Sequence, residues 1–133
     1  MVKIDSELVR LVMRIGYAAA WNGMFDEALK IFTGVNAVRR ESEVPLVGIA
    51  VVGFISGNLD LAQKALDEAL KISPKNDLVQ AHHACLLRLL GKEEEGQALF
   101  AALENSQDPD AKSMSQKVKN IPTEELFNAE AKS

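Results

Sequence analysis

Hydrophobic and small residues recur along the chain with one long period. Three glycines, Gly23, Gly57 and Gly91, lie 34 residues apart each time. Alignment on these glycines divides the sequence into three blocks, 9–42, 43–76 and 77–110, and further positions then fall into columns without an insertion. A period of this length is typical of proteins that stack one supersecondary unit repeatedly.

The columns indicate what each unit is. Two columns contain only small residues, namely Gly16, Ala50 and Ala84 before the glycines and Ala28, Ala62 and Gly96 after them. Antiparallel helices joined by a short turn approach closely only where no large side chain separates their backbones. A third column contains large residues suited to the gap between one helix pair and the next: Phe32, Leu66 and Phe100. The pattern therefore predicts three packed helix pairs.

Glycine and proline positions predict where helices end. Gly23, Gly57 and Gly91 stand where the first helix of each pair should stop, because glycine freely adopts the left-handed conformation common there. After the third pair, Ala111, Met114 and Val118 recur at helical spacing, which predicts a capping helix over 111–121 with one solvent-exposed face. Residues 122–133 are expected to form a short helix or a disordered tail, since the last of them have little to bury.

The 34-residue period, its small columns and Pro74 resemble the tetratricopeptide repeat over residues 9–110. The middle repeat matches best, whereas the first has Arg40 at the family's proline position and the third has Pro109 one residue late. The resemblance implies an all-α fold, a superhelix of three antiparallel helix pairs plus a C-terminal capping helix, in a single domain over 1–121.

In such repeats the first helix of every pair lines a concave face that grips a partner. The family pattern places fifteen residues inward, and we predict that the apolar ones bind the partner. They are Met13, Tyr17, Trp21, Val44, Val47, Val51, Phe54, Ile55, Leu78, Ala81, Cys85 and Leu89, with Arg10, Ala20 and Arg88 at the remaining inward positions. An amphipathic helix of a partner protein is the natural occupant of an apolar groove, which indicates a chaperone or adaptor.

One alternative for this groove stays open, and a second is not expected. The chain itself could pack it, through the capping helix or by self-association as a homodimer, which would make the protein a structural scaffold or a general interaction module. A carboxylate clamp for an acidic C-terminus, known in this repeat family, is not expected. Its basic and amide positions fall on side chains that do not provide charge-assisted hydrogen bonds, apart from a protonated histidine: Met13, Tyr17, Val51, Leu78 and His82.

Charge and composition exclude several other classes. The 133 residues include 15 basic and 19 acidic ones that are interspersed, giving a net charge of −4, so nucleic acid is not an expected partner. The nearly uncharged run 44–59 is interrupted by glycine and proline and is shorter than the roughly 20 residues of a membrane span. A single cysteine, Cys85, and the absence of an apolar leader predict a reducing cytoplasm.

An enzymatic role is not expected either. His82 and Cys85 lie three residues apart and share a helix face, which would supply half of a metal site. No second cysteine exists and His83 points to another face, so we expect neither a metal nor another cofactor. No glycine-rich phosphate loop or nucleophile motif is present, and no catalytic residue is predicted.

A narrower resemblance concerns small, acidic, stand-alone proteins of three such repeats. The segment 100–112, with its Leu-x-x-Ser-Gln-Asp-Pro core, is similar to the end of the needle-subunit chaperones of bacterial type III secretion systems. Translocator chaperones are the nearest rival. The resemblance implies a cytoplasmic virulence-related chaperone that wraps an amphipathic helix of an export subunit, with a small helical co-chaperone as a further partner.

Overall fold

The structure is a computed structural model and describes residues 5–127. Within that range the chain is all-α, which confirms the predicted fold class. The helices are α1 (Ser6–Trp21), α2 (Phe25–Val38), α3 (Val44–Ser56), α4 (Leu59–Ile72), α5 (Asp77–Leu89), α6 (Glu93–Ala102) and α7 (Pro109–Val118), followed by one turn of 3-10 helix, η1 (Thr123–Glu125).

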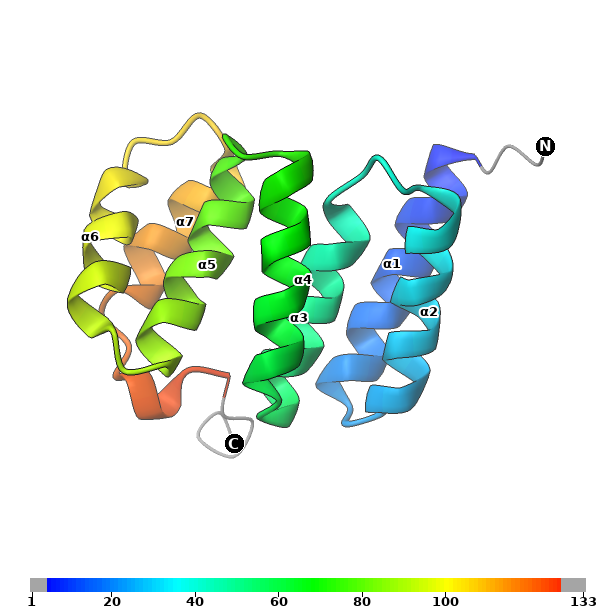
Figure 1. The fold of residues 1–133 in the computed structure, drawn as a ribbon, viewed down its shortest axis with the longest axis horizontal. Helices are drawn as coiled ribbons and strands as arrows, with labels where there is room; N and C mark the ends of the chain where they lie inside the picture. The colour runs from blue at the N-terminus through cyan, green and yellow to red at the C-terminus, as the bar shows by residue number, and fades with distance from the viewer. Residues whose placement is uncertain (1–4, 128–133) are drawn as a thin grey trace.

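The helices form three antiparallel pairs that stack side by side, α1 with α2, α3 with α4 and α5 with α6 (Figure 1). The second helix of one pair packs on the first helix of the next, and α3 also contacts both α1 and α5. Helix α7 packs against α5 and α6 at the end of the stack. The first helices therefore form one layer, which is the concave layer of such repeats.

Local sequence signals set the turns within the pairs. Gly23, Gly57 and Gly91 all have positive φ, between 79° and 86°, as predicted for the residue that ends a first helix. Asn58 caps α4, where its side chain accepts a hydrogen bond of 3.1 Å from the Leu61 backbone N–H. Such caps satisfy amide groups that have no partner inside the helix.

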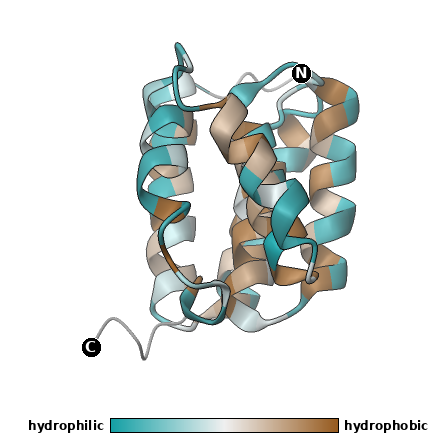
Figure 2. Cartoon of the chain, turned by 90° about the vertical axis from the view of Figure 1, so that its left-hand side faces the viewer, coloured by the Kyte–Doolittle hydropathy of each residue, from teal (hydrophilic) through white to brown (hydrophobic). Residues whose placement is uncertain are grey.

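The core lies where the columns of the sequence predicted it. Phe32, Leu66 and Phe100 are completely buried. A methyl group added at Gly16 would lie 2.6 Å from the Phe32 ring and one at Gly48 would lie 2.8 Å from it, so small residues on α1 and α3 make room for this side chain. Figure 2 views the end of the stack formed by α6 and α7, where hydrophobic and hydrophilic residues alternate along the helices.

The boundaries at the C-terminal end differ from the prediction. The cap was expected over 111–121, but α7 runs from Pro109 to Val118. Asp108 caps this helix, because its side chain accepts hydrogen bonds from the backbone of Asp110 and Ala111 at 2.9 and 3.1 Å, and Pro109 suits the first helical position. Of the predicted tail, 128–133 lie outside the described residues.

Candidate functional site: the concave face

We define the trough as the surface formed by the inward-facing residues of α1, α3 and α5. The predicted partner-binding residues all lie on these helices but differ in exposure. Trp21 and Val44 are exposed by 41% and 46%. Four more are half-buried, namely Tyr17, Ile55, Leu78 and Leu89. The remaining six are buried: Met13, Val47, Val51, Phe54, Ala81 and Cys85. Their contact with a partner stays a prediction, and in this conformation the completely buried Ala81 and Cys85 are inaccessible.

One end of the trough, at the N-terminal ends of α1 and α3, is open. A pocket of about 430 Å³ lies there between α1, the end of α2 and the start of α3. Its apolar lining includes Val9, Met13 and Val44. Three arginines also line the pocket, Arg10, Arg14 and Arg39, although the protein as a whole is acidic. The open end thus combines an apolar lining with a local concentration of positive charge.

Tyr17 lies at the centre of the trough. It lines this pocket and two further pockets, one with Val47 and Leu78 and one with Trp21 and Val51. Its ring contacts Phe32 edge to face, with the ring centroids 5.0 Å apart. Burial raises the pKa of the Tyr17 hydroxyl to about 12, so this group stays neutral at physiological pH. Tyr17 therefore lies between the three pockets that the predicted partner-binding residues line.

The other end of the trough is covered by the chain itself. Phe127 stacks on Phe54 at 4.8 Å and on Trp21 at 6.3 Å between ring centroids. Leu126 is only 8% exposed. Together with Ile121 they line a pocket of about 300 Å³ whose remaining residues come mainly from α1, α3, α5 and α7. The alternative in which the chain packs its own groove is thus realised at this end, by the residues after α7 and by α7 itself.

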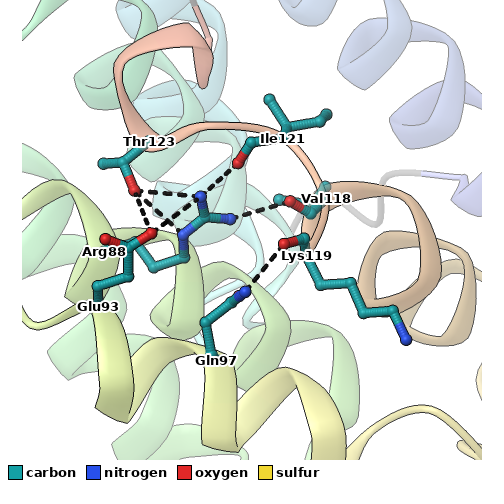
Figure 3. Close-up of polar contacts among 7 residues, drawn as sticks. All are labelled: Arg88, Glu93, Gln97, Val118, Lys119, Ile121 and Thr123. Atoms are coloured by element: carbon teal, nitrogen blue, oxygen red, sulfur yellow. Dashed lines mark hydrogen bonds and ion pairs between the residues drawn. The ribbon is translucent and has the colours of Figure 1, made fainter.

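A buried arginine fixes the start of this covering segment (Figure 3). Arg88 on α5 is 2% exposed and donates hydrogen bonds to the backbone carbonyls of Val118, at 2.9 Å, and Ile121. It also donates to Thr123 Oγ1 from two of its nitrogens, at 3.1 and 3.3 Å. Gln97 on α6 donates to the Lys119 carbonyl at 2.9 Å. The Val118 and Ile121 carbonyls thus accept charge-assisted hydrogen bonds from Arg88, and the Lys119 carbonyl accepts one from a neutral amide.

Sequence reasoning placed Arg88 inward but gave it no role, and it did not anticipate Leu126 and Phe127 in the trough. A signal for Arg88 existed, since an arginine in a largely apolar row needs acceptors for its guanidinium group. No such signal existed for Phe127, which has no counterpart in the repeat. Its position depends on where the chain turns after α7.

Two titratable residues of α5, His82 and Cys85, are buried. His82 is 8% exposed and its Nδ1 lies 2.8 Å from the Leu78 carbonyl, while burial lowers its pKa. Burial raises the pKa of the Cys85 thiol to about 12. Among residues 5–127 no three His, Cys, Asp or Glu side chains are grouped in a way that would hold a metal ion. None of the helices in this range has the length and apolar character of a membrane span.

The fold is similar to that of the type III secretion chaperone SycD of Yersinia enterocolitica, whose crystal structure was determined in complex with a peptide of the translocator YopD. The likeness has a TM-score of 0.68 at 17% sequence identity and covers 95% of this chain and 96% of that one. It establishes a shared helical-repeat fold. No family model matches the sequence, and no curated protein matches it.

Proposed function

We propose that this protein is a chaperone that holds an apolar segment of a client protein in its trough, as part of type III secretion in a bacterial cytoplasm. The observation that carries this proposal is the open end of the trough, where apolar side chains line an unfilled pocket of about 430 Å³. An apolar pocket of this kind on a repeat protein favours a partner that buries it. The shared fold of a chaperone that binds a translocator peptide supports the same role.

The same comparison favours one class of client. The sequence resemblance ranked needle subunits first and translocators second. The structural likeness is to a translocator chaperone over nearly the whole of both chains. We therefore favour a translocator-like export subunit as the client, and a small co-chaperone is not required by this proposal.

The chemistry of the open end restricts the segment that fits there. Arg10, Arg14 and Arg39 line a pocket that is otherwise largely apolar. A client segment that places apolar residues in the pocket and carboxylates at its edge would satisfy both features, since charge complementarity at an interface favours the correct partner. We expect the bound segment to be amphipathic, with Asp or Glu next to its buried residues.

The test compares two exposed valines in the tagged protein, purified from its own host with the bound proteins identified by mass spectrometry. Val44 is the first residue of α3 and lines two of the trough pockets, so Val44→Asp puts a charge in the trough at a helix N-terminus, where a carboxylate is tolerated. Val38, which is 50% exposed at the end of α2, lines none of these pockets, and Val38→Asp is the matched control.

We expect Val44→Asp to reduce the amount of bound client about tenfold or more, because its carboxylate removes an apolar contact and competes with client carboxylates for the arginines of the pocket. Val38→Asp should retain the client. Circular dichroism should show that both variants keep their helical content. Equal client recovery with both variants, or no export subunit among the bound proteins, would contradict the proposal.

A second candidate, self-association, is favoured by the outer side of α1. Leu8, Leu11 and Ile15 are exposed by 51 to 53% and share one face of this helix, which lies at the end of the described stack. Light scattering of the purified protein tests it. A dimer that becomes a monomer with Leu11→Glu would assign this face to self-association, and a monomeric wild-type protein would remove this candidate.

A further inference from the structure

The segment 121–127, called the tail segment below, occupies the part of the trough where sequence reasoning placed the partner. Phe127 lies against Trp21 and Phe54, which are both predicted partner-binding residues. Ile121, Leu126 and Phe127 line the same pocket as Tyr17 and Val51, two more residues of that row. A client that used the whole predicted row would therefore meet the tail segment.

The packing of the tail segment is incomplete. A pocket of about 300 Å³ remains among the tail segment, α7 and the trough helices. Side chains next to an unfilled volume lose dispersion contacts that a better-shaped ligand would regain. The tail segment thus shields this apolar surface without filling it.

The two halves of the tail segment are held differently. The guanidinium group of Arg88 binds the Ile121 carbonyl and the Thr123 hydroxyl, so the first half is anchored by hydrogen bonds from a buried charge. The hydrogen bonds of Glu125 and Leu126 are local ones, to the carbonyls of Pro122 and Thr123. Phe127 has a φ of 58°, a conformation that costs a non-glycine residue ~1 kcal/mol. The second half is therefore held mainly by its apolar contacts.

We propose that residues 124–127 are an internal placeholder for the client, which leaves the trough when a client segment binds there. The inference rests on the proposed function and deepens it. It also states what the client presents at this end, namely a large apolar or aromatic side chain between Trp21 and Phe54, preceded by acidic residues as in Glu124-Glu125-Leu126-Phe127. Without a client, residues 124–127 would then cover apolar surface of the trough that the client contacts when it is bound.

The test needs no client, because a synthetic peptide with the sequence of residues 119–127 serves as the probe. In the full-length variant Leu126→Ala/Phe127→Ala the trough should accept this peptide, whereas in the wild type the attached tail segment competes at an effective concentration of about millimolar. Trp21 is the only tryptophan of the chain and stacks on Phe127, so its fluorescence reports occupancy. The matched control peptide carries alanine at the positions of Leu126 and Phe127.

We expect the peptide to bind the double variant at least tenfold more tightly than the wild type, and the control peptide to bind neither. In the variant alone, Trp21 emission should shift to the red, and the peptide should reverse that shift. No peptide binding to a folded double variant would overturn the proposal and leave the tail segment as a fixed part of the fold. If the double variant lost its helical signal, Thr123→Val would replace it, since this change removes only the hydroxyl that contacts Arg88 and Glu93.

The peptide experiment and the client capture fail independently. Peptide binding without any captured export client would support the placeholder proposal and contradict the proposed chaperone role. A client captured through Val44 without peptide binding would keep the role and remove the placeholder. If both hold, the double variant should retain about tenfold more client than the wild type, because no internal competitor remains.

Discussion

The backbone of Gly96 lies directly against the buried stem of Arg88. A methyl group added at Gly96 would lie 2.6 Å from Arg88 Cγ and 2.8 Å from the Ala84 carbonyl oxygen. The first two repeats have alanine in this column, Ala28 and Ala62. The third needs glycine because the inward position opposite it holds an arginine whose stem passes through this space.

This contact predicts that Gly96→Ala destabilises the protein. The added methyl group would displace Arg88, whose guanidinium group anchors the tail segment, so we expect a loss of ~1–3 kcal/mol in the free energy of unfolding. Urea denaturation measures it. Gly34→Ala is the control, since a methyl group there would meet nothing within 4 Å and should stabilise α2 by ~0.5–1 kcal/mol. If the two variants were equally stable, the predicted clash between residue 96 and Arg88 would be contradicted.

Arg88→Met should loosen the residues after α7 while leaving the repeats folded. Methionine keeps an apolar stem but leaves the Ile121 carbonyl without its Arg88 donor, whereas the Val118 carbonyl keeps its bond from the Ile121 backbone N–H, so the change costs ~1–3 kcal/mol. Glu93 approaches Arg88 at 3.8 Å but is 61% exposed, so Glu93→Gln should change stability by less than ~1 kcal/mol. Limited proteolysis should then cleave the Arg88→Met variant after α7 faster than the Glu93→Gln variant, and equal cleavage rates would contradict the anchor.

The arginines of the open pocket should make client binding dependent on salt. Arg10→Glu/Arg14→Glu places two negative charges where we expect client carboxylates, so the affinity for the client should fall about tenfold or more at roughly 50 mM salt. The loss should be smaller at roughly 500 mM salt, because salt screens the interactions between exposed charges. Arg40→Glu changes a charge outside this pocket and should have little effect. An affinity for the client that is independent of salt would contradict the role of these arginines.

The repeat could be predicted from the sequence because each of its physical requirements recurs three times. The left-handed turns at Gly23, Gly57 and Gly91 and the buried knobs Phe32, Leu66 and Phe100 depend on residues within one repeat and its neighbour. Local chemistry of this kind leaves a periodic record in the sequence.

The state of the trough could not be predicted in the same way. Whether Phe54 is open or covered depends on Phe127, more than 70 residues later in the sequence, and on the chain direction set by Arg88. These contacts occur once, so no period reveals them. The start of α7 could have been predicted more closely, because Asp108 followed by Pro109 is a recognised helix start.

The two histidines predict how stability depends on pH. Burial lowers the pKa of His82 below its usual 6.5, and burial, more than the opposing effect of Asp67 and Glu95, lowers that of His83. The unfolded chain therefore gains protons first as the pH falls through about 6.5, and this contribution to stability is present above that pH and lost below it.

We expect the free energy of unfolding to fall between about pH 7.5 and pH 5.5, with a slope of at most ~1.4 kcal/mol per pH unit for each histidine. His82→Asn should remove part of this slope, and His82→Asn/His83→Asn leaves no histidine in the chain, so any slope that remains belongs to other groups. Urea denaturation at each pH gives the values. If the double variant kept the full slope of the wild type, neither histidine would be a source of the pH dependence.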